Sequence, residues 1–253
     1  LTGLCGIPQT NKTLLLQQLM FDTLARSGDN SSAILIDTEG ALVISLMGWK
    51  EIFEKVYNIK RDIVIGNIIV EPKKKIWGLI TEPKKINTPS IICIDARNIT
   101  NVTALHGLPI KLNPSDKGRL GVRLAIEGND VPQAEDSLIG VLCRENNVKF
   151  IGYDSVTAPS NIFISGELNF PNRDDAMGLW IMQAQNLSSV FDIPVVGTLH
   201  LTHNEANQFD MGKAEGGKSI HHNFKFLIRI DRFRNPRTGN PAQNPNLIDK
   251  RKI

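Results

Sequence analysis

A lysine–threonine pair, six residues after a glycine, is the first pattern in the chain with recognisable chemistry. The segment reads Gly6-Ile7-Pro8-Gln9-Thr10-Asn11-Lys12-Thr13 and is followed by Leu14. A loop of this kind between a strand and a helix binds phosphate through its backbone N–H groups, its lysine and a Mg²⁺ on its hydroxyl. Asn11 stands where such loops carry a glycine, and asparagine tolerates a left-handed backbone. Alone, the segment fits a phosphate loop and a plain strand–turn–helix equally well.

Polar residues also follow three short apolar runs. Glu39 comes just after the run 33–37, Asp154 ends the run 147–154, and His200 follows the run 193–199. In open α/β sheets, ligands bind beyond the carboxyl ends of the strands. Separately, each acid fits a helix cap or a loop position. Together with Lys12 and Thr13, they supply the groups for nucleotide hydrolysis: phosphate binding, metal support by Thr13 and Asp154, and water activation by Glu39.

These residues need a parallel sheet to bring them together. The three apolar runs have the form of strands buried on both faces, and helical patterns lie between them at 12–26, 133–145 and 172–191. We therefore expect an α/β fold with a mostly parallel, twisted sheet flanked by helices. The stretch 71–121 lacks a helical pattern and holds short apolar runs at 76–80, 90–94 and 107–112. It predicts a small β-rich insert between core segments 1–70 and 122–253.

Composition places the chain among ordinary globular proteins. Of its 253 residues, 41% are hydrophobic and 22% are charged. It has no apolar run of about 18 residues and no signal peptide, so we expect neither a membrane span nor a membrane partner. Three cysteines, far apart and odd in number, indicate buried thiols in a reducing compartment, hence a cytoplasmic protein. Because the chain opens directly on an apolar strand pattern, we expect the natural protein to carry residues before Leu1.

Several segments together resemble the RecA superfamily, closest to the archaeal RadA and RadB recombinase group. In chain order they are Leu4-Cys5-Gly6 leading into Lys12-Thr13, Ile36-Asp37-Thr38-Glu39-Gly40, Tyr153-Asp154-Ser155-Val156-Thr157-Ala158-Pro159, Ile193-Pro194-Val195-Val196-Gly197-Thr198, and Gly216-Gly217-Lys218 through His222 to Arg229-Ile230. They cover most of the chain outside about 71–121. The combination of Asp-Thr-Glu-Gly with Asp-Ser-Val-Thr-Ala is the more specific part of the resemblance.

The resemblance implies a RecA-like core that binds ATP and Mg²⁺. Lys12 and Thr13 match the nucleotide-binding pair of the family, Glu39 its water-activating glutamate, and Asp154 its metal-supporting aspartate. His200 stands where the family has a glutamine that senses the γ-phosphate. With Asn11 in the loop, this departure favours slow hydrolysis.

The same resemblance implies DNA as a partner in recombination or repair, and association with copies of the chain or with related proteins. The matching DNA-facing loop, 203–217, is locally acidic, and the net charge is only +3. Phosphate contacts are therefore expected from the basic clusters Lys73–Lys75, Lys84–Lys85 and Arg232, Arg234 and Arg237. Two alternatives stay open: a nucleotide-binding scaffold or regulatory subunit with little hydrolysis, and a regulatory ATPase of the KaiC type unconnected with DNA.

Overall fold

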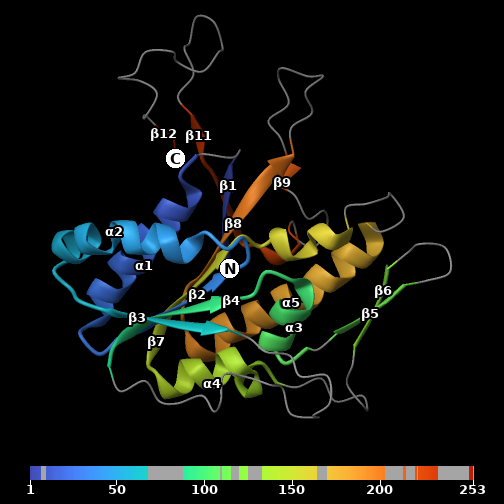
Figure 1. The fold of residues 1–253 in the computed structure, drawn as a ribbon, viewed down its shortest axis with the longest axis horizontal. Helices are drawn as coiled ribbons and strands as arrows, with labels where there is room; N and C mark the ends of the chain where they lie inside the picture. Colours follow the sequence, from blue (N-terminus) through green and yellow to red (C-terminus); the bar gives the residue numbers. More distant parts are fainter. Residues whose placement is uncertain are drawn as a thin grey trace, which may run out of the picture.

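A seven-stranded, all-parallel path forms the centre of the molecule (Figure 1). The computed structural model describes residues 1–6, 10–67, 88–108, 110–114, 120–124, 133–163, 170–202, 213–214, 220, 222–232 and 251–252. In spatial order the strands are β10 (Phe226–Arg229), β1 (Thr2–Gly6), β8 (Val195–Thr202), β7 (Val148–Asp154), β2 (Ser32–Asp37), β4 (Ser90–Asp95) and β3 (Asp62–Asn67). A two-residue strand, β9 (Lys213–Ala214), adds to β8 in the antiparallel direction. The predicted, mostly parallel α/β sheet is thus confirmed.

Helices cover both faces of this sheet. α1 (Lys12–Ser27) and α2 (Leu42–Tyr57) pack on one face, and α3 (Ile99–Leu105), α4 (Leu138–Glu145) and α5 (Phe170–Phe191) pack on the other. Short 3-10 helices at Ala134–Asp136 and Ala158–Phe163 complete the second layer. Strands separated by helical crossovers must run parallel, so their carboxyl ends all lie at one edge of the sheet.

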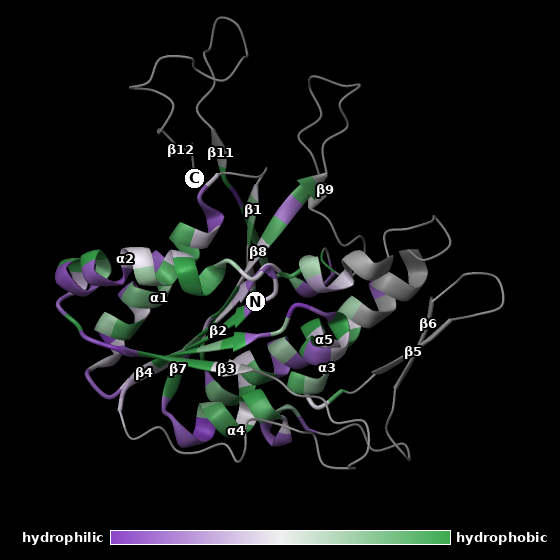
Figure 2. Ribbon diagram, in the orientation of Figure 1, coloured by the Kyte–Doolittle hydropathy of each residue, from purple (hydrophilic) through white to green (hydrophobic). Residues whose placement is uncertain are grey.

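The two faces of the sheet are built from alternate residues of the same strands. In β2, Leu35 packs with the side chains of α1 and α2, while Ile34 and Ile36 pack with those of α3, α4 and α5. All three are fully buried, which is why this strand reads as a continuous apolar run and not as an alternating one. Figure 2 shows the same hydrophobic centre, with hydrophilic residues concentrated on the helix surfaces.

The predicted boundaries of the β-rich insert are wrong at β4. Ser90–Asp95 was expected inside the insert, yet it pairs with both β2 and β3 in the central sheet. Helix α3 then occupies 99–105, where no helix was expected; the Asn98 side chain accepts a hydrogen bond from the Asn101 N–H at 2.8 Å and caps it. A short apolar run between turns looks the same in either setting, because its partner strands are distant in sequence.

Part of the remaining predicted insert forms a separate β-hairpin-like pair, and part lies outside the described residues. β5 (Ile110–Pro114) and β6 (Leu120–Leu124) form an antiparallel pair of their own. The core was expected to resume at 122, but β6 pairs with β5 and not with the central sheet. The run at 76–80 and the lysines at 73–75 and 84–85 lie outside the described residues.

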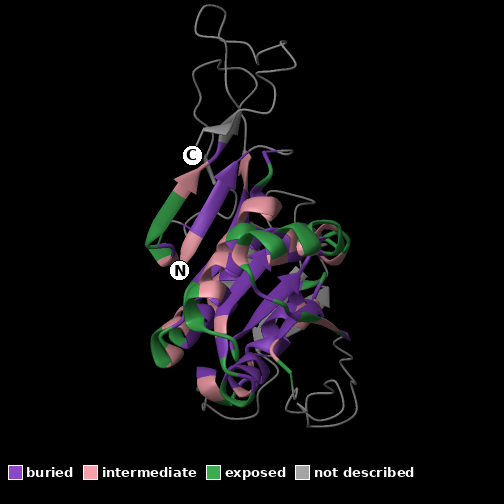
Figure 3. Ribbon diagram, turned by 90° about the vertical axis from the view of Figure 1, so that its left-hand side faces the viewer, coloured by how far each residue is buried: buried purple, intermediate pink, exposed green. Residues whose placement is uncertain are grey.

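Burial agrees with the expectation for the cysteines. Cys5, Cys93 and Cys143 are all buried and carry free thiols, and burial raises the pKa of Cys93 and Cys143 to about 12. Figure 3 shows the buried sheet enclosed by intermediate and exposed helix surfaces. In the described part of the chain, every helix is too short or too polar to cross a membrane.

Candidate nucleotide site

The strand registers bring the predicted site residues to one edge of the sheet. Gly6 at the end of β1 lies opposite His200 of β8, and Asp37 at the end of β2 lies opposite Asp154 of β7. A cavity of about 410 Å³ opens there. It is lined by Thr10, Asn11, Lys12, Thr13, Leu14, Glu39, Ser45, Trp49, Asp154, Thr198 and His200. Eight of these eleven residues are ones that the sequence singled out.

The start of α1 is built as the sequence predicts. Asn11 has φ 61° and ψ 31°, so the asparagine does take the left-handed conformation that the glycine of such loops usually supplies. Gly6 is needed for a different reason: a Cβ there would lie 2.7 Å from the Ile230 carbonyl oxygen. Ile7, Pro8 and Gln9, the middle of the predicted loop, lie outside the described residues.

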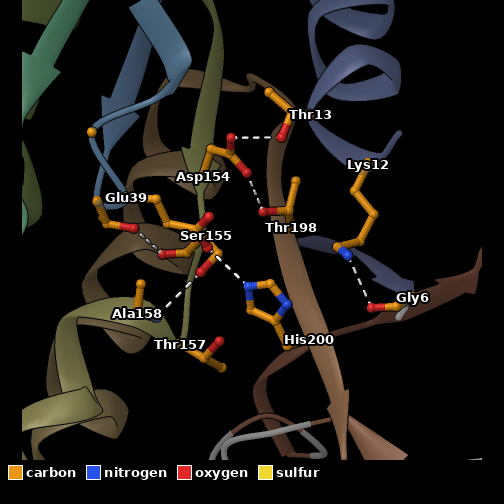
Figure 4. Close-up of polar contacts among 12 residues, drawn as sticks. Gly6, Lys12, Thr13, Glu39, Asp154, Ser155, Thr157, Ala158, Thr198 and His200 are labelled. Atoms are coloured by element: carbon orange, nitrogen blue, oxygen red, sulfur yellow. Dashed lines mark hydrogen bonds and ion pairs between the residues drawn. The ribbon is translucent and has the colours of Figure 1, made fainter. Parts of the chain in front are cut away.

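Lys12 is held inside the site. Its side chain is 7% exposed, and its Nζ donates a hydrogen bond to the Gly6 carbonyl oxygen at 2.9 Å (Figure 4). Burial lowers the pKa of the Lys12 ammonium, while the carboxylates of Asp154 and Glu39 act in the opposite direction. The ammonium thus sits in a partly desolvated position, where water screens its attraction for an incoming phosphate only weakly.

Asp154 is fixed by two hydroxyl groups. The Thr13 Oγ1 donates to one carboxylate oxygen at 2.7 Å, and the Thr198 Oγ1 donates to the other at 2.5 Å (Figure 4). Burial raises the pKa of Asp154, and the two hydroxyl hydrogen bonds counteract that rise. This geometry joins α1, β7 and β8 at one carboxylate.

Glu39 contacts His200 across the mouth of the cavity. The His200 Nε2 lies 2.9 Å from Glu39 Oε1, and each side chain is about one-third exposed. The hydrogen bond from His200 is the largest effect on the pKa of Glu39 and lowers it; burial opposes this, and a hydrogen bond from Ser155 adds to it. Glu39 is therefore a carboxylate at neutral pH, already engaged by an imidazole.

Asp37 and Thr38 position the Glu39 loop. The Asp37 carboxylate accepts hydrogen bonds from the backbone N–H groups of Glu39 at 3.1 Å, Gly40 at 2.6 Å and Leu42 at 3.1 Å. Thr38 donates from its N–H to the Asp154 carbonyl at 2.8 Å and from its hydroxyl to the Ser155 carbonyl at 2.6 Å. The ends of β2 and β7 are thereby tied together, which holds Glu39 over the cavity.

Sequence reasoning missed the roles of Asp37, Thr38 and Thr198, and it missed Trp49 in the cavity wall. Aspartate side chains commonly accept hydrogen bonds from backbone N–H groups two residues later in a turn. An aspartate at the end of a strand, as at Asp37, is therefore a sequence signal for the contacts with Glu39 and Gly40. Trp49 carries no such signal, because α2 itself was not predicted. Thr198 was recognised only as part of a strand and of a segment that resembles the RecA superfamily.

The donor set suits magnesium held mainly by a nucleotide. Mg²⁺ in phosphate sites takes one or two carboxylate or hydroxyl contacts and completes its shell with waters and phosphate oxygens. Thr13 and Asp154 form such a pair, already 2.7 Å apart through their oxygens. Among the described residues, no group of three or more histidine, cysteine or acidic side chains could hold a metal by itself.

The case for a function rests on the cavity, its lysine, its fixed aspartate and its paired glutamate. No protein-family model matches the chain, and no curated protein matches it either.

Proposed function

We propose that this chain is a RecA-type protein that binds ATP with Mg²⁺ in the cavity at the start of α1 and hydrolyses it slowly. The observation that carries the proposal is the convergence of Lys12 and Thr13, Glu39 and Asp154 on one cavity from three separate segments of the chain. Each of these residues has the chemistry that phosphoryl transfer to water requires.

Each side chain has a task that follows from its position. The Lys12 ammonium exchanges the Gly6 carbonyl for phosphate oxygens, which carry more negative charge. Thr13 and Asp154 would hold Mg²⁺, and the metal would neutralise phosphate charge. Glu39 orients the attacking water and accepts its proton at a carboxylate oxygen.

Slow turnover follows from the state of Glu39. Its carboxylate is hydrogen-bonded to His200, so that contact must weaken before Glu39 can accept a proton from water. The lowered pKa of Glu39 also makes it a weaker base than a free glutamate. The same contact supports the alternative of a nucleotide-binding scaffold or regulatory subunit that scarcely hydrolyses ATP.

The binding site is tested by removing the Lys12 charge. Lys12→Ala should weaken Mg²⁺–ATP binding by about 1.5–3 kcal/mol, or roughly 10- to 150-fold in Kd, because a charge-assisted contact is lost. Lys149→Ala is the matched control, since it removes the same charge at the opposite end of β7. Isothermal titration calorimetry should show weakening for the first variant alone; equal affinity in all three proteins, or no binding by the wild type, contradicts the site.

A role in DNA recombination or repair is part of the proposal and has a test of its own. DNA binding carried by Lys73–Lys75, Lys84–Lys85 and the arginines after β10 should fall steeply as salt rises, since counterions are released from the phosphates. Filter binding at two salt concentrations, with and without ATP, measures this. An absence of binding at low salt would remove DNA from the function and favour the scaffold alternative.

A further inference from the structure

One surface of α2 is apolar and uncovered by the described part of the chain. The exposed fractions are 76% for Ile44, 65% for Met47, 49% for Ile52 and 68% for Val56. Gly48, also exposed, lies between them. We call these five residues the α2 stripe. Among the described residues, they include four of the ten exposed large hydrophobic side chains.

The α2 stripe is distinct from the face by which α2 joins the core. Leu42, Leu46 and Phe53 are buried against the hydrophobic cluster shared with α1, whereas Ile44, Ile52 and Val56 point away from it. α2 lies at the side of the molecule that faces the viewer in Figure 3. Single exposed apolar residues are ordinary, but several on one side of one helix, here beside the exposed Glu51 and Lys55, indicate an interaction surface.

The spacing within the stripe forms a ridge. Ile44, Gly48, Ile52 and Val56 recur every four residues, so they line up along one side of the helix. Ridges of this spacing on two helices interlock in the most common mode of helix packing. The stripe therefore has the form that a second helix requires.

The same ridge is complementary to itself. An antiparallel two-fold pairing centred near Lys50 sets Ile44 against Val56 of the second copy and Gly48 against Ile52 of the second copy. A Cβ built on Gly48 meets no atom within 4 Å, so the glycine leaves open space on the helix surface. An isoleucine from the facing helix can enter that space, which permits close approach of the two backbones.

Area and charge also fit a pair of identical helices. The exposed fractions amount to about two and a half fully exposed side chains, or roughly 400 Å² of apolar surface. The apolar part of a standard interface is about 450–500 Å² on each partner. The charged residues of α2 are Lys50, Glu51, Glu54 and Lys55, so the helix has no net charge to repel its copy.

We infer that α2 is a homodimerisation surface, in which two copies of this chain pair antiparallel through the α2 stripe. The inference does not depend on the nucleotide site. An anionic membrane surface is the rival occupant. Helices that lie on membranes carry more lysine and arginine than acidic residues on their polar face, whereas α2 has two lysines and two glutamates.

Sedimentation velocity of the full chain over a concentration series tests the inference. The wild type should shift reversibly from monomer to dimer, while Ile44→Glu/Ile52→Glu should raise the dissociation constant at least about tenfold, because charges replace the centre of the contact. The matched control is Met182→Glu/Val190→Glu, which adds two carboxylates at exposed apolar positions of α5. The control should dimerise as the wild type does.

Gly48→Gln separates loss of association from loss of folding. Glutamine is a better helix former than glycine, and its side chain has open space in the monomer, so thermal stability at high dilution should not fall. In the dimer it occupies the space for Ile52 of the second copy, so the dissociation constant should again rise about tenfold or more. A monomeric wild type throughout the series, including one that instead binds anionic vesicles, overturns the inference. So does a dimer that persists in both stripe variants.

Discussion

A fully buried histidine makes the stability of the protein depend on pH. His106 is fully buried at the end of α3, with its Nε2 2.9 Å from the Tyr153 hydroxyl. Its ring stacks with Tyr153 and Trp180 at centroid distances of 5.8 and 5.7 Å. Among the described residues, its Nδ1 has no hydrogen-bond partner. Nothing there compensates a positive charge.

Burial lowers the pKa of His106 from the ordinary 6.5 to about 3. Between these two values the unfolded chain binds a proton that the folded protein does not, so the free energy of unfolding falls as pH falls below 6.5. The stabilising effect of the neutral ring is complete above pH 6.5. The loss at pH 5, relative to pH 8, comes to about 2 kcal/mol.

The matched variant is His106→Phe/Tyr153→Phe. It keeps the stacked rings, removes the titrating group, and replaces both hydrogen-bonding partners together so that neither is left unpaired in the core. Urea unfolding followed by circular dichroism, at several pH values from 5 to 8, gives the free energy of unfolding of both proteins. Carboxylates such as Asp154 titrate in both, so the difference between the two curves isolates His106.

The expected result is that wild-type stability falls by about 2 kcal/mol more than that of the variant between pH 8 and pH 5. Parallel curves for the two proteins would refute the reasoning. They would mean that His106 is protonated in the folded state without cost, or that its ring reaches water.

Three further outcomes follow from the same contacts. Glu39→Gln keeps the shape and hydrogen bonding of the side chain but removes the base, so ATP turnover should fall about a hundredfold or more while calorimetry shows nucleotide binding retained; unchanged turnover would assign the activity to another group. Asn11→Ala should lower the free energy of unfolding by about 1 kcal/mol, because alanine is strained at φ 61°, and Asn11→Gly should relieve that strain; equal midpoints in thermal melts would contradict this. Arg61 is 4% exposed and donates to the Gly28, Ser31 and Lys60 carbonyls, so Arg61→Leu should lower the free energy of unfolding in urea by about 3 kcal/mol, and a loss under about 1 kcal/mol would show that water replaces the guanidinium.

The sequence by itself determined the parallel α/β class of the core and the edge of the sheet where the site lies. Runs such as 33–37 and 147–154 have the form of strands buried on both faces, and only a strand covered by helices on both sides buries such a run completely. Since parallel strands end at the same edge, Glu39, Asp154 and His200 had to lie near Lys12. The left-handed backbone at Asn11 was also readable, because few residues other than glycine accept it.

Only the tertiary structure decided the pairings between distant segments. β4 belongs to the core because β2 and β3 flank it, and nothing within 90–95 identifies those partners. The contacts of Asp154 with Thr13 and Thr198, and of Glu39 with His200, join side chains that are far apart in sequence.

The exposure of the apolar residues of α2 was likewise decided only by the tertiary structure. In sequence, the exposed Ile44, Ile52 and Val56 cannot be told from the buried Leu42, Leu46 and Phe53, because all six are apolar residues of one helix. Packing against α1 uses one side of the helix and leaves the other in solvent. Which apolar side chains are buried is set by the neighbouring elements, because hydrophobic burial depends on area removed from water and not on residue type alone.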